Sequence, residues 1–205
     1  MKSYPSMSFG QPTDLTMHVF DKLDGSNIRA EWSKKRGFYK FGTRHHLLGA
    51  DDPMLGPSIE LITKKYGDDL SHRFKELKYE SAVAFFEYIG PRSQFGHHLI
   101  DDPHDVVLID VNPYKIGILD PDRFVASFGD LDIPKVLHVG PIDQTFIDSV
   151  YADELAGITF EGVVCKGKAA RNTDVPVMFK LKTKKWLDAL RARCGSDQKL
   201  FDTLK

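Results

Sequence analysis

Strand-like segments occur in groups along this chain, with helical patterns between the groups. Grouped strands favour antiparallel pairing, whereas strict alternation of strand and helix favours a parallel sheet. Alternating or continuous apolar runs predict strands at residues 16–20, 28–32, 37–41, 81–89, 106–111, 158–166 and 176–182. Helical spacing predicts helices at residues 57–66, 70–77, 121–128, 143–155 and 184–193. We therefore predict an α+β fold of antiparallel sheets with flanking helices.

The size and composition of the chain suit one domain. It has 205 residues, of which 41% are hydrophobic, enough for one sizeable core or for two tightly joined subdomains. With no internal repeat and no low-complexity linker, residues 1–205 are expected to form a single domain. The formal net charge of -1 lacks the basic balance of many nucleic-acid-binding proteins, but it allows a local basic groove.

Cysteine usage and apolar runs bear on cellular location. Cys165 and Cys194 are too few for a disulfide framework, and free thiols suit a reducing compartment. No apolar run approaches the ~20 residues that span a bilayer, and residues 1–10 lack the apolar stretch of a secretory signal. We expect a soluble, cytoplasmic protein with no membrane partner.

A lysine stands at the end of the first expected strand, in the run Lys22-Leu23-Asp24-Gly25. In a cleft wall, desolvation and neighbouring cations lower a lysine pKa, and a neutral amine can then attack a phosphorus or carbonyl centre. Gly25 permits a sharp turn or a close backbone approach. Taken alone, the run is short enough to be an ordinary solvated turn.

Two carboxylates accompany apolar strands further along the chain. Glu87 interrupts the strand at residues 81–89, and Glu161 stands near the start of the strand at residues 158–166. A charge within an apolar strand is paired, hydrogen-bonded or bound to a metal or ligand, unless it faces solvent. Each carboxylate is therefore a candidate for metal or nucleotide binding, and for Glu87 the alternative is that it points to the solvent side of its strand.

The last expected strand carries two lysines, Lys180 and Lys182. Strand alternation places both on one face, where two ammonium groups repel each other unless an anion lies near them. A polyphosphate is such an anion. Together, a nucleophilic lysine, two carboxylates and a lysine pair supply what phosphoryl transfer needs: an attacking amine, a site for a hard divalent cation and neutralisation of phosphate charge.

In this order the motifs resemble those of the covalent nucleotidyltransferase superfamily, which contains ATP-dependent DNA and RNA ligases and mRNA-capping guanylyltransferases. The resemblance covers about residues 16–186 in five short motifs. These are Lys22-Leu23-Asp24-Gly25, Phe85-Phe86-Glu87-Tyr88, the strand at residues 107–111, Glu161-Gly162-Val163-Val164 and Lys180-Leu181-Lys182.

The resemblance implies a fold, a cofactor and roles for individual residues. The implied fold is an ATP-grasp-like nucleotidyltransferase domain, α+β with a nucleotide cleft. Lys22 would carry AMP from ATP, with Lys180 and Lys182 assisting at the phosphates, and Glu161 would engage Mg²⁺ or Mn²⁺. The full set of nucleotide-binding residues that it implies is Asp21, Leu23, Asn27, Arg44, Glu87, Glu161, Lys180 and Lys182.

Two features favour the RNA ligase 2-like branch of ATP-dependent RNA ligases. Ser26-Asn27 extends the first motif in the way common to RNA ligases, and Arg44 stands where that branch has an arginine for the nucleotide or the acceptor phosphates. The chain ends about twenty residues after the lysine pair, so no oligonucleotide-binding (OB-fold) barrel is expected. The implied substrate is a polynucleotide with 5′-phosphate and 3′-hydroxyl ends, with RNA favoured over DNA.

Several alternatives stay open at this point. The chain could be a minimal DNA ligase that seals nicks, a capping enzyme that forms a GMP adduct, or a non-catalytic nucleic-acid-binding module with the same fold. End joining could also depend on a partner protein or domain. Phosphate contacts are candidate roles for basic residues at two places in the sequence, Lys34, Lys35 and Arg36, and Lys184, Lys185, Arg191 and Arg193, although such charges commonly just face solvent.

Overall fold

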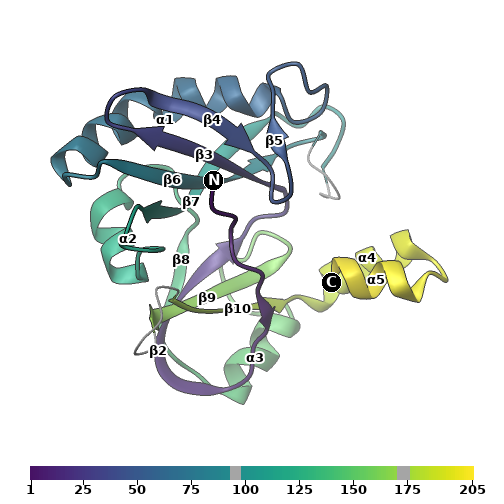
Figure 1. Cartoon of the computed structure of the whole chain (residues 1–205). Helices are drawn as coiled ribbons and strands as arrows, with labels where there is room; N and C mark the ends of the chain where they lie inside the picture. Colours follow the sequence, from purple (N-terminus) through teal and green to yellow (C-terminus); the bar gives the residue numbers. More distant parts are fainter. Residues whose placement is uncertain (93–97, 170–175) are drawn as a thin grey trace. The chain divides into compact units, whose positions relative to one another are not determined.

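The computed structural model describes residues 1–92, 98–169 and 176–205. The chain divides into two compact units (Figure 1). Of the described residues, unit 1 takes those in Met1–Ser6, Asp24–Pro134 and Lys168–Pro176, and unit 2 takes Met7–Leu23, Lys135–Gly167 and Val177–Lys205. The single domain expected from the sequence stays a prediction.

Unit 1 is built on a sheet whose described strands all pair in antiparallel fashion. The order of the five strands across this sheet is β5-β4-β3-β6-β7. This arrangement confirms the antiparallel α+β prediction for unit 1. The bounds are β3 (Ser26–Ser33), β4 (Gly37–Gly42), β5 (Leu47–Leu48), β6 (Ser81–Ile89) and β7 (Asp105–Pro113), with helices α1 (Pro57–Glu76) and α2 (Pro121–Phe128).

Helix α1 covers one face of the unit 1 sheet. Its buried side chains recur every four residues, from Ile62 and Tyr66 to Leu70 and Phe74, so one stripe of the helix faces the core. Aromatic contacts join the helix to the sheet. The ring centroids of Phe74 and Trp32 lie 5.1 Å apart, and those of Tyr66 and Phe86 lie 5.2 Å apart. The sequence predicted two helices here, but α1 is continuous because this stripe is unbroken.

The other face of the unit 1 sheet is polar. Strand register places Glu31 beside Val83, Arg29 beside Phe85 and Asn27 beside Glu87. Across the next strand, Asp110 pairs with Phe85 and Asn112 with Val83.

The N-terminal segment lies on this polar face. Arg29 Nη1 donates hydrogen bonds to the Met1 carbonyl at 3.0 Å and to Ser3 Oγ at 2.7 Å. Tyr4 donates from its hydroxyl to Asp110 Oδ2 at 2.8 Å, and its ring packs 5.0 Å from that of Phe85. The segment therefore gives hydrogen-bond partners to two buried charged side chains within the strands, Arg29 and Asp110.

Unit 2 is built on a second sheet, with strand order β1-β10-β9-β2-β8. Strand β1 is parallel to β10, whereas β2 is antiparallel to both β8 and β9. The buried core of this unit includes Met17, Val19, Val163, Phe179 and Leu181. The bounds are β1 (Ser8–Phe9), β2 (Thr13–Lys22), β8 (Val136–Ile142), α3 (Gln144–Tyr151), β9 (Gly162–Ala169), β10 (Pro176–Lys182), α4 (Lys184–Cys194) and α5 (Gln198–Leu204).

Unit 2 differs from the sequence prediction at several boundaries. Strand β2 continues through Lys22, which the sequence placed in a turn, and β9 begins only at Gly162. The strand β8 was missed because Gly140 and Pro141 interrupt it, although proline is tolerated on an edge strand. Among the described residues, no helix is long and apolar enough to cross a membrane.

Candidate active site

Lys22 and Glu161 meet in unit 2 through strand register. Lys22 ends β2 and pairs with Gly162, the residue after Glu161. Lys22 Nζ donates a hydrogen bond to Glu161 Oε2 at 2.7 Å, across 139 positions of sequence. The Lys22 side chain is 19% exposed and that of Glu161 is 6% exposed, so the pair is accessible from the lysine side.

Lys182 binds the other oxygen of the same carboxylate. It ends β10, and its Nζ donates to Glu161 Oε1. The same nitrogen lies 3.6 Å from the ring centroid of Trp186 in α4, an arrangement that stabilises a cation over an aromatic face. One buried carboxylate thus bridges two ammonium groups, and the three residues are called the lysine–glutamate bridge below.

The charges of this bridge perturb its pKa values. Burial alone would raise the pKa of Glu161, but the neighbouring charges of Lys22 and Lys182 outweigh burial and leave it below its ordinary value. The pKa of Lys182 is lowered to about 7, first by burial and then by the charge of Lys22, against the opposing effect of Glu161. Lys182 therefore holds its proton weakly near neutral pH.

Backbone geometry around Glu161 holds the bridge in place. Gly162 has a φ of +139°, and a Cβ there would collide with the carbonyl oxygen of Leu181, so only glycine fits. Thr183 follows Lys182 and caps α4: its backbone N–H donates to the Glu161 carbonyl at 3.1 Å, and its hydroxyl donates to the Phe160 carbonyl at 2.8 Å. Strands β9 and β10 are therefore tied together beside the carboxylate.

A second pair of residues, Asp21 and Thr159, holds the segment before Glu161 against the end of β2. Asp21 is 4% exposed, and its Oδ1 accepts from the Thr159 backbone N–H at 3.0 Å while its Oδ2 accepts from the Thr159 hydroxyl. Asp21 precedes Lys22, and Thr159 lies two residues before Glu161. The Asp21–Thr159 pair therefore joins the two segments that carry the lysine and the carboxylate, and nucleotide binding by Asp21 stays a prediction.

Three further candidates lie in unit 1. Asn27 and Glu87 are cross-strand neighbours on β3 and β6, on the polar face of the sheet. Arg44 is exposed and follows β4. Burial, and then the charge of Asp110, raise the pKa of Tyr4 well above its usual range; Glu87 adds to this shift and Arg44 opposes it. Glu87 and Arg44 therefore both act on Tyr4 electrostatically, and Asn27 is the cross-strand neighbour of Glu87.

The other predicted residues have different surroundings. Lys180 Nζ donates to the Lys205 carbonyl at 2.7 Å and lies 5.1 Å from the Phe9 ring centroid, so its head is not part of the lysine–glutamate bridge. Leu23 is half-buried after the end of β2. Among the basic residues considered for phosphate contact, Lys184 pairs with Asp188, and Arg191 packs over the Phe201 ring.

Glu161 fits the chemistry of a Mg²⁺ or Mn²⁺ site of one particular kind. Within the described ranges, no group of three or more His, Cys, Asp or Glu side chains could hold a metal ion. Mg²⁺ commonly keeps several waters and binds through one or two carboxylates together with substrate phosphates. A single carboxylate beside a lysine suits this mode, in which a bound ion would neutralise charge on substrate phosphates.

Sequence reasoning missed three residues that support the site: Thr159, Thr183 and Trp186. A threonine directly before a helical pattern is an N-cap signal, so Thr183 was detectable. The bond of Thr159 to Asp21 spans 138 positions, and the contact of Trp186 with Lys182 depends on how α4 leaves β10. Neither leaves a signal in local sequence.

The low pKa of Lys182 predicts a pH-dependent stability. The unfolded chain holds a proton on residue 182 up to the ordinary lysine pKa of 10.5, whereas the folded state releases it near pH 7. The unfolded state therefore binds more protons in this range, and the free energy of unfolding rises with pH. Between pH 6 and pH 9 the wild type should gain about 2–3 kcal/mol relative to Lys182→Met, measured by urea unfolding. Parallel stability profiles for the two proteins would contradict the perturbed pKa.

A scan against protein-family models finds no match, and neither does a search of curated proteins. Among solved structures, an archaeal ATP-dependent RNA ligase matches 99% of this chain with a TM-score of 0.67 and 20% identity. A mutant RNA ligase from Naegleria gruberi, solved with ATP and Mn, matches 92% with a TM-score of 0.63 and 15% identity.

These matches concern part of each ligase. The chain spans 55% of the archaeal ligase and 59% of the Naegleria ligase. At 15–20% identity the likeness is one of fold. This chain has the α+β fold found in ATP-dependent RNA ligases, as its five sequence motifs predicted.

Proposed function

We propose that this chain is the nucleotidyltransferase part of an ATP-dependent RNA ligase and that Lys22 carries the nucleotide. The observation that carries the proposal is the lysine–glutamate bridge, in which one buried carboxylate holds the partly exposed Lys22 beside Lys182. The fold shared with ATP-dependent RNA ligases supports it. The solved Naegleria ligase with ATP and Mn supports ATP and a divalent ion as cofactors.

In the first step, Lys22 Nζ attacks the α-phosphorus of ATP. A nitrogen–phosphorus bond forms, the bond to the leaving pyrophosphate breaks, and the lysine nitrogen gives up a proton. Glu161 Oε2 lies 2.7 Å from that nitrogen, within reach of the proton. Divalent metal ions neutralise charge on the phosphates when bound, and Glu161 would hold such an ion through its carboxylate.

Lys182 has a complementary role in this step. A phosphate beside it favours its ammonium form, because an anion offsets the burial that lowers its pKa. We propose that Lys182 contacts the α-phosphate and that Lys180 contacts phosphates further out. While Lys182 is charged, it also helps to keep the Lys22 amine neutral through repulsion.

The unit 1 residues are proposed to bind the same nucleotide. Asn27 is five residues after Lys22, so the covalent chain alone keeps it within about 18 Å. Asn27 would contact phosphate or metal-bound water, Glu87 the sugar, and Arg44 the nucleotide or the acceptor phosphates. Leu23 is proposed to contact the nucleotide from the adjacent position in the chain.

Sealing would follow in two further steps. AMP passes from Lys22 to the 5′-phosphate of a polynucleotide, and a 3′-hydroxyl then displaces AMP to form the phosphodiester. RNA is the proposed substrate, and a partner protein or a further domain is proposed to assist end joining, since the chain corresponds to about half of the ligases it matches.

A covalent adduct is the first expected outcome. Wild-type protein, stripped of bound AMP with pyrophosphate, should gain the mass of one AMP after incubation with ATP and Mg²⁺ or Mn²⁺. Lys22→Ala should gain none because it lacks the attacking amine, whereas Lys199→Ala, at an exposed lysine of α5, should match the wild type. Intact-mass spectrometry measures all three. A GMP adduct from GTP would instead indicate capping chemistry, and no adduct with either nucleotide would favour a binding module.

The choice of polynucleotide is tested by nick sealing. Duplexes that are identical except for ribose or deoxyribose residues flanking the nick are incubated with the adenylated protein. We expect RNA nicks to be sealed at least about tenfold faster, because the 2′-hydroxyl is what distinguishes the two sugars. Gel electrophoresis measures the sealed product. Equal or faster sealing of the DNA nick would favour a minimal DNA ligase.

A further inference from the structure

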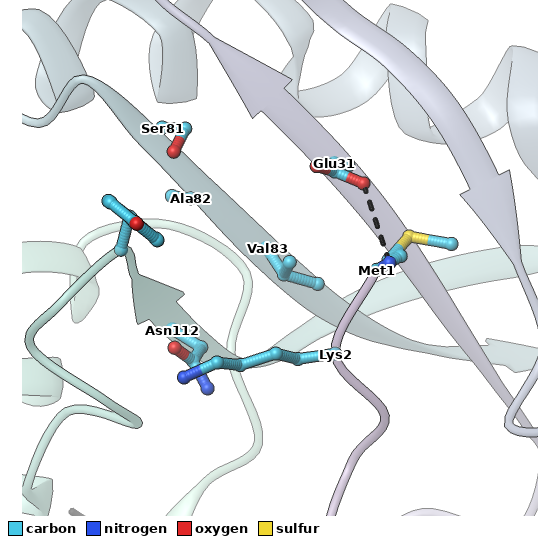
Figure 2. Close-up of a pocket in the computed structure, with 8 residues that line it drawn as sticks. Met1, Lys2, Glu31, Ser81, Ala82, Val83 and Asn112 are labelled. Atoms are coloured by element: carbon cyan, nitrogen blue, oxygen red, sulfur yellow. Dashed lines mark ion pairs between the residues drawn. The ribbon is translucent and has the colours of Figure 1, made fainter.

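Unit 1 has a pocket of about 190 Å³ on the polar face of its sheet (Figure 2). Its walls include Lys2, Glu31, Val83, Asn112 and Tyr114. The volume is below the range of about 300–1,000 Å³ for drug-sized ligands. The pocket is therefore the right size for one ring system and too small for a whole dinucleotide.

Strand register gives the pocket an apolar floor between two polar walls. Glu31 on β3 pairs with Val83 on β6, and Val83 pairs with Asn112 on β7. Adjacent strands lie about 4.8 Å apart, so the Glu31 and Asn112 backbones stand roughly 10 Å apart with Val83 between them. Figure 2 shows the three side chains on this face, with Lys2 extending toward Asn112. A flat ring would rest on Val83 with its edges at the two polar groups.

Both polar walls present hydrogen-bond acceptors. Asn112 is 7% exposed, and its Oδ1 is buried with no hydrogen bond to any described residue. Glu31 Oε1 accepts from the Tyr39 hydroxyl at 2.8 Å. Its Oε2 is also buried without a hydrogen bond in the described structure, with the nearest cations at 3.8 Å (Lys40) and 4.0 Å (the Met1 nitrogen). Buried acceptors left unsatisfied are costly, so the pocket is suited to a ligand that brings N–H donors.

The rim adds an aromatic ring and positive charge. Tyr114 is 63% exposed, with Lys115 Nζ 5.5 Å from its ring centroid. Lys2 lines the pocket, and Lys40 and Lys115 lie next to the lining residues Glu31 and Tyr114. Bases of single-stranded nucleic acid stack on aromatic side chains, and lysines contact the phosphates outside. An N–H-donating ring with an attached anion therefore matches the pocket and its rim together.

We propose that this pocket binds a nucleobase that carries an exocyclic amino group, as part of a nucleotide. Glutamate accepts from the cytosine amino group, and asparagine pairs with the amino edge of adenine. Uracil presents a carbonyl oxygen where cytosine has its amino group, and that oxygen would face the Glu31 carboxylate. The identification of the ligand as a polynucleotide base rests on the proposed function, since an RNA ligase substrate supplies such bases.

The pocket is separate from the residues proposed for adenylation. Asn27 and Glu31 lie on the same face of β3, four residues apart, and this spacing corresponds to about 13 Å. The N-terminal segment occupies the face between them through its contacts with Arg29 and Asp110. A base in the pocket would therefore belong to a nucleotide other than the one on Lys22.

The test compares CMP with UMP, which differ at the amino position and are not the nucleotide proposed for Lys22. Binding to ¹⁵N-labelled full-length protein is followed by NMR through the side-chain amide of Asn112 and the backbone amide of Val83. CMP should shift both signals and bind at least about tenfold more tightly than UMP. Glu31→Gln and Asn112→Leu should each weaken CMP binding about tenfold or more, whereas Glu80→Gln, at an exposed neighbouring carboxylate, should not.

Oligonucleotides distinguish the source of the base. If r(C)₄ binds much more tightly than CMP in a salt-dependent manner, the ligand is a nucleotide within a strand, and equal affinities indicate a free nucleotide; both results support the pocket. Equal binding of CMP and UMP, or affinity unchanged in folded Glu31→Gln and Asn112→Leu proteins, would overturn it. AMP-adduct formation is measured on the same samples, so loss of the adduct with retained CMP binding refutes only the proposed function.

Discussion

One buried carboxylate with two ammonium groups is the interaction on which the candidate site depends. Glu161 offers two oxygens and a single negative charge, and Lys22 and Lys182 each take one oxygen. Burying an unpaired charge is costly, so removal of the carboxylate would leave two like charges in a poorly solvated place. Burial, and then the charge of Lys22, lower the pKa of Lys182 to about 7, so the proton on Lys182 is weakly held near neutral pH.

The surrounding structure is organised to hold this bridge. The Asp21–Thr159 pair ties the end of β2 to the segment before Glu161. Thr183 ties that segment to the start of α4, and Gly162 lets the start of β9 lie close to the end of the neighbouring strand β10. Each contact involves a residue within two positions of a bridge member. Positional precision of this kind is what a phosphoryl-transfer site requires, because catalysis there comes mainly from positioning and electrostatics.

The sequence predicted much of the fold because its periodicities are local. Strands β6 and β10 and helix α2 have the predicted bounds, since turn residues or prolines mark their ends. The continuous α1 was predicted as two helices because Gly67 and the acidic residues after it resemble a break. The strand β8 was missed because its pairing with β2, and not its own composition, makes it a strand.

The candidate site was predictable in part for the same reason. The order of motifs pointed to Lys22, Glu161 and Lys182, and unit 2 brings these three together. Contacts such as Asp21 with Thr159, and Trp186 with Lys182, arise only from long-range packing. The direction of Lys180 toward the Lys205 carbonyl was equally hidden, because strand alternation specifies a face and not the contacts of a long side chain.

We propose that Lys22, among the lysines of unit 2, receives the nucleotide. The most direct measurement is to digest the adenylated protein at mildly alkaline pH, which preserves the nitrogen–phosphorus bond, and to locate AMP by peptide fragmentation. AMP is expected on Lys22 alone. AMP on Lys182, Lys180 or Lys166 would contradict it, because the partly exposed lysine of the bridge would then not be the nucleophile.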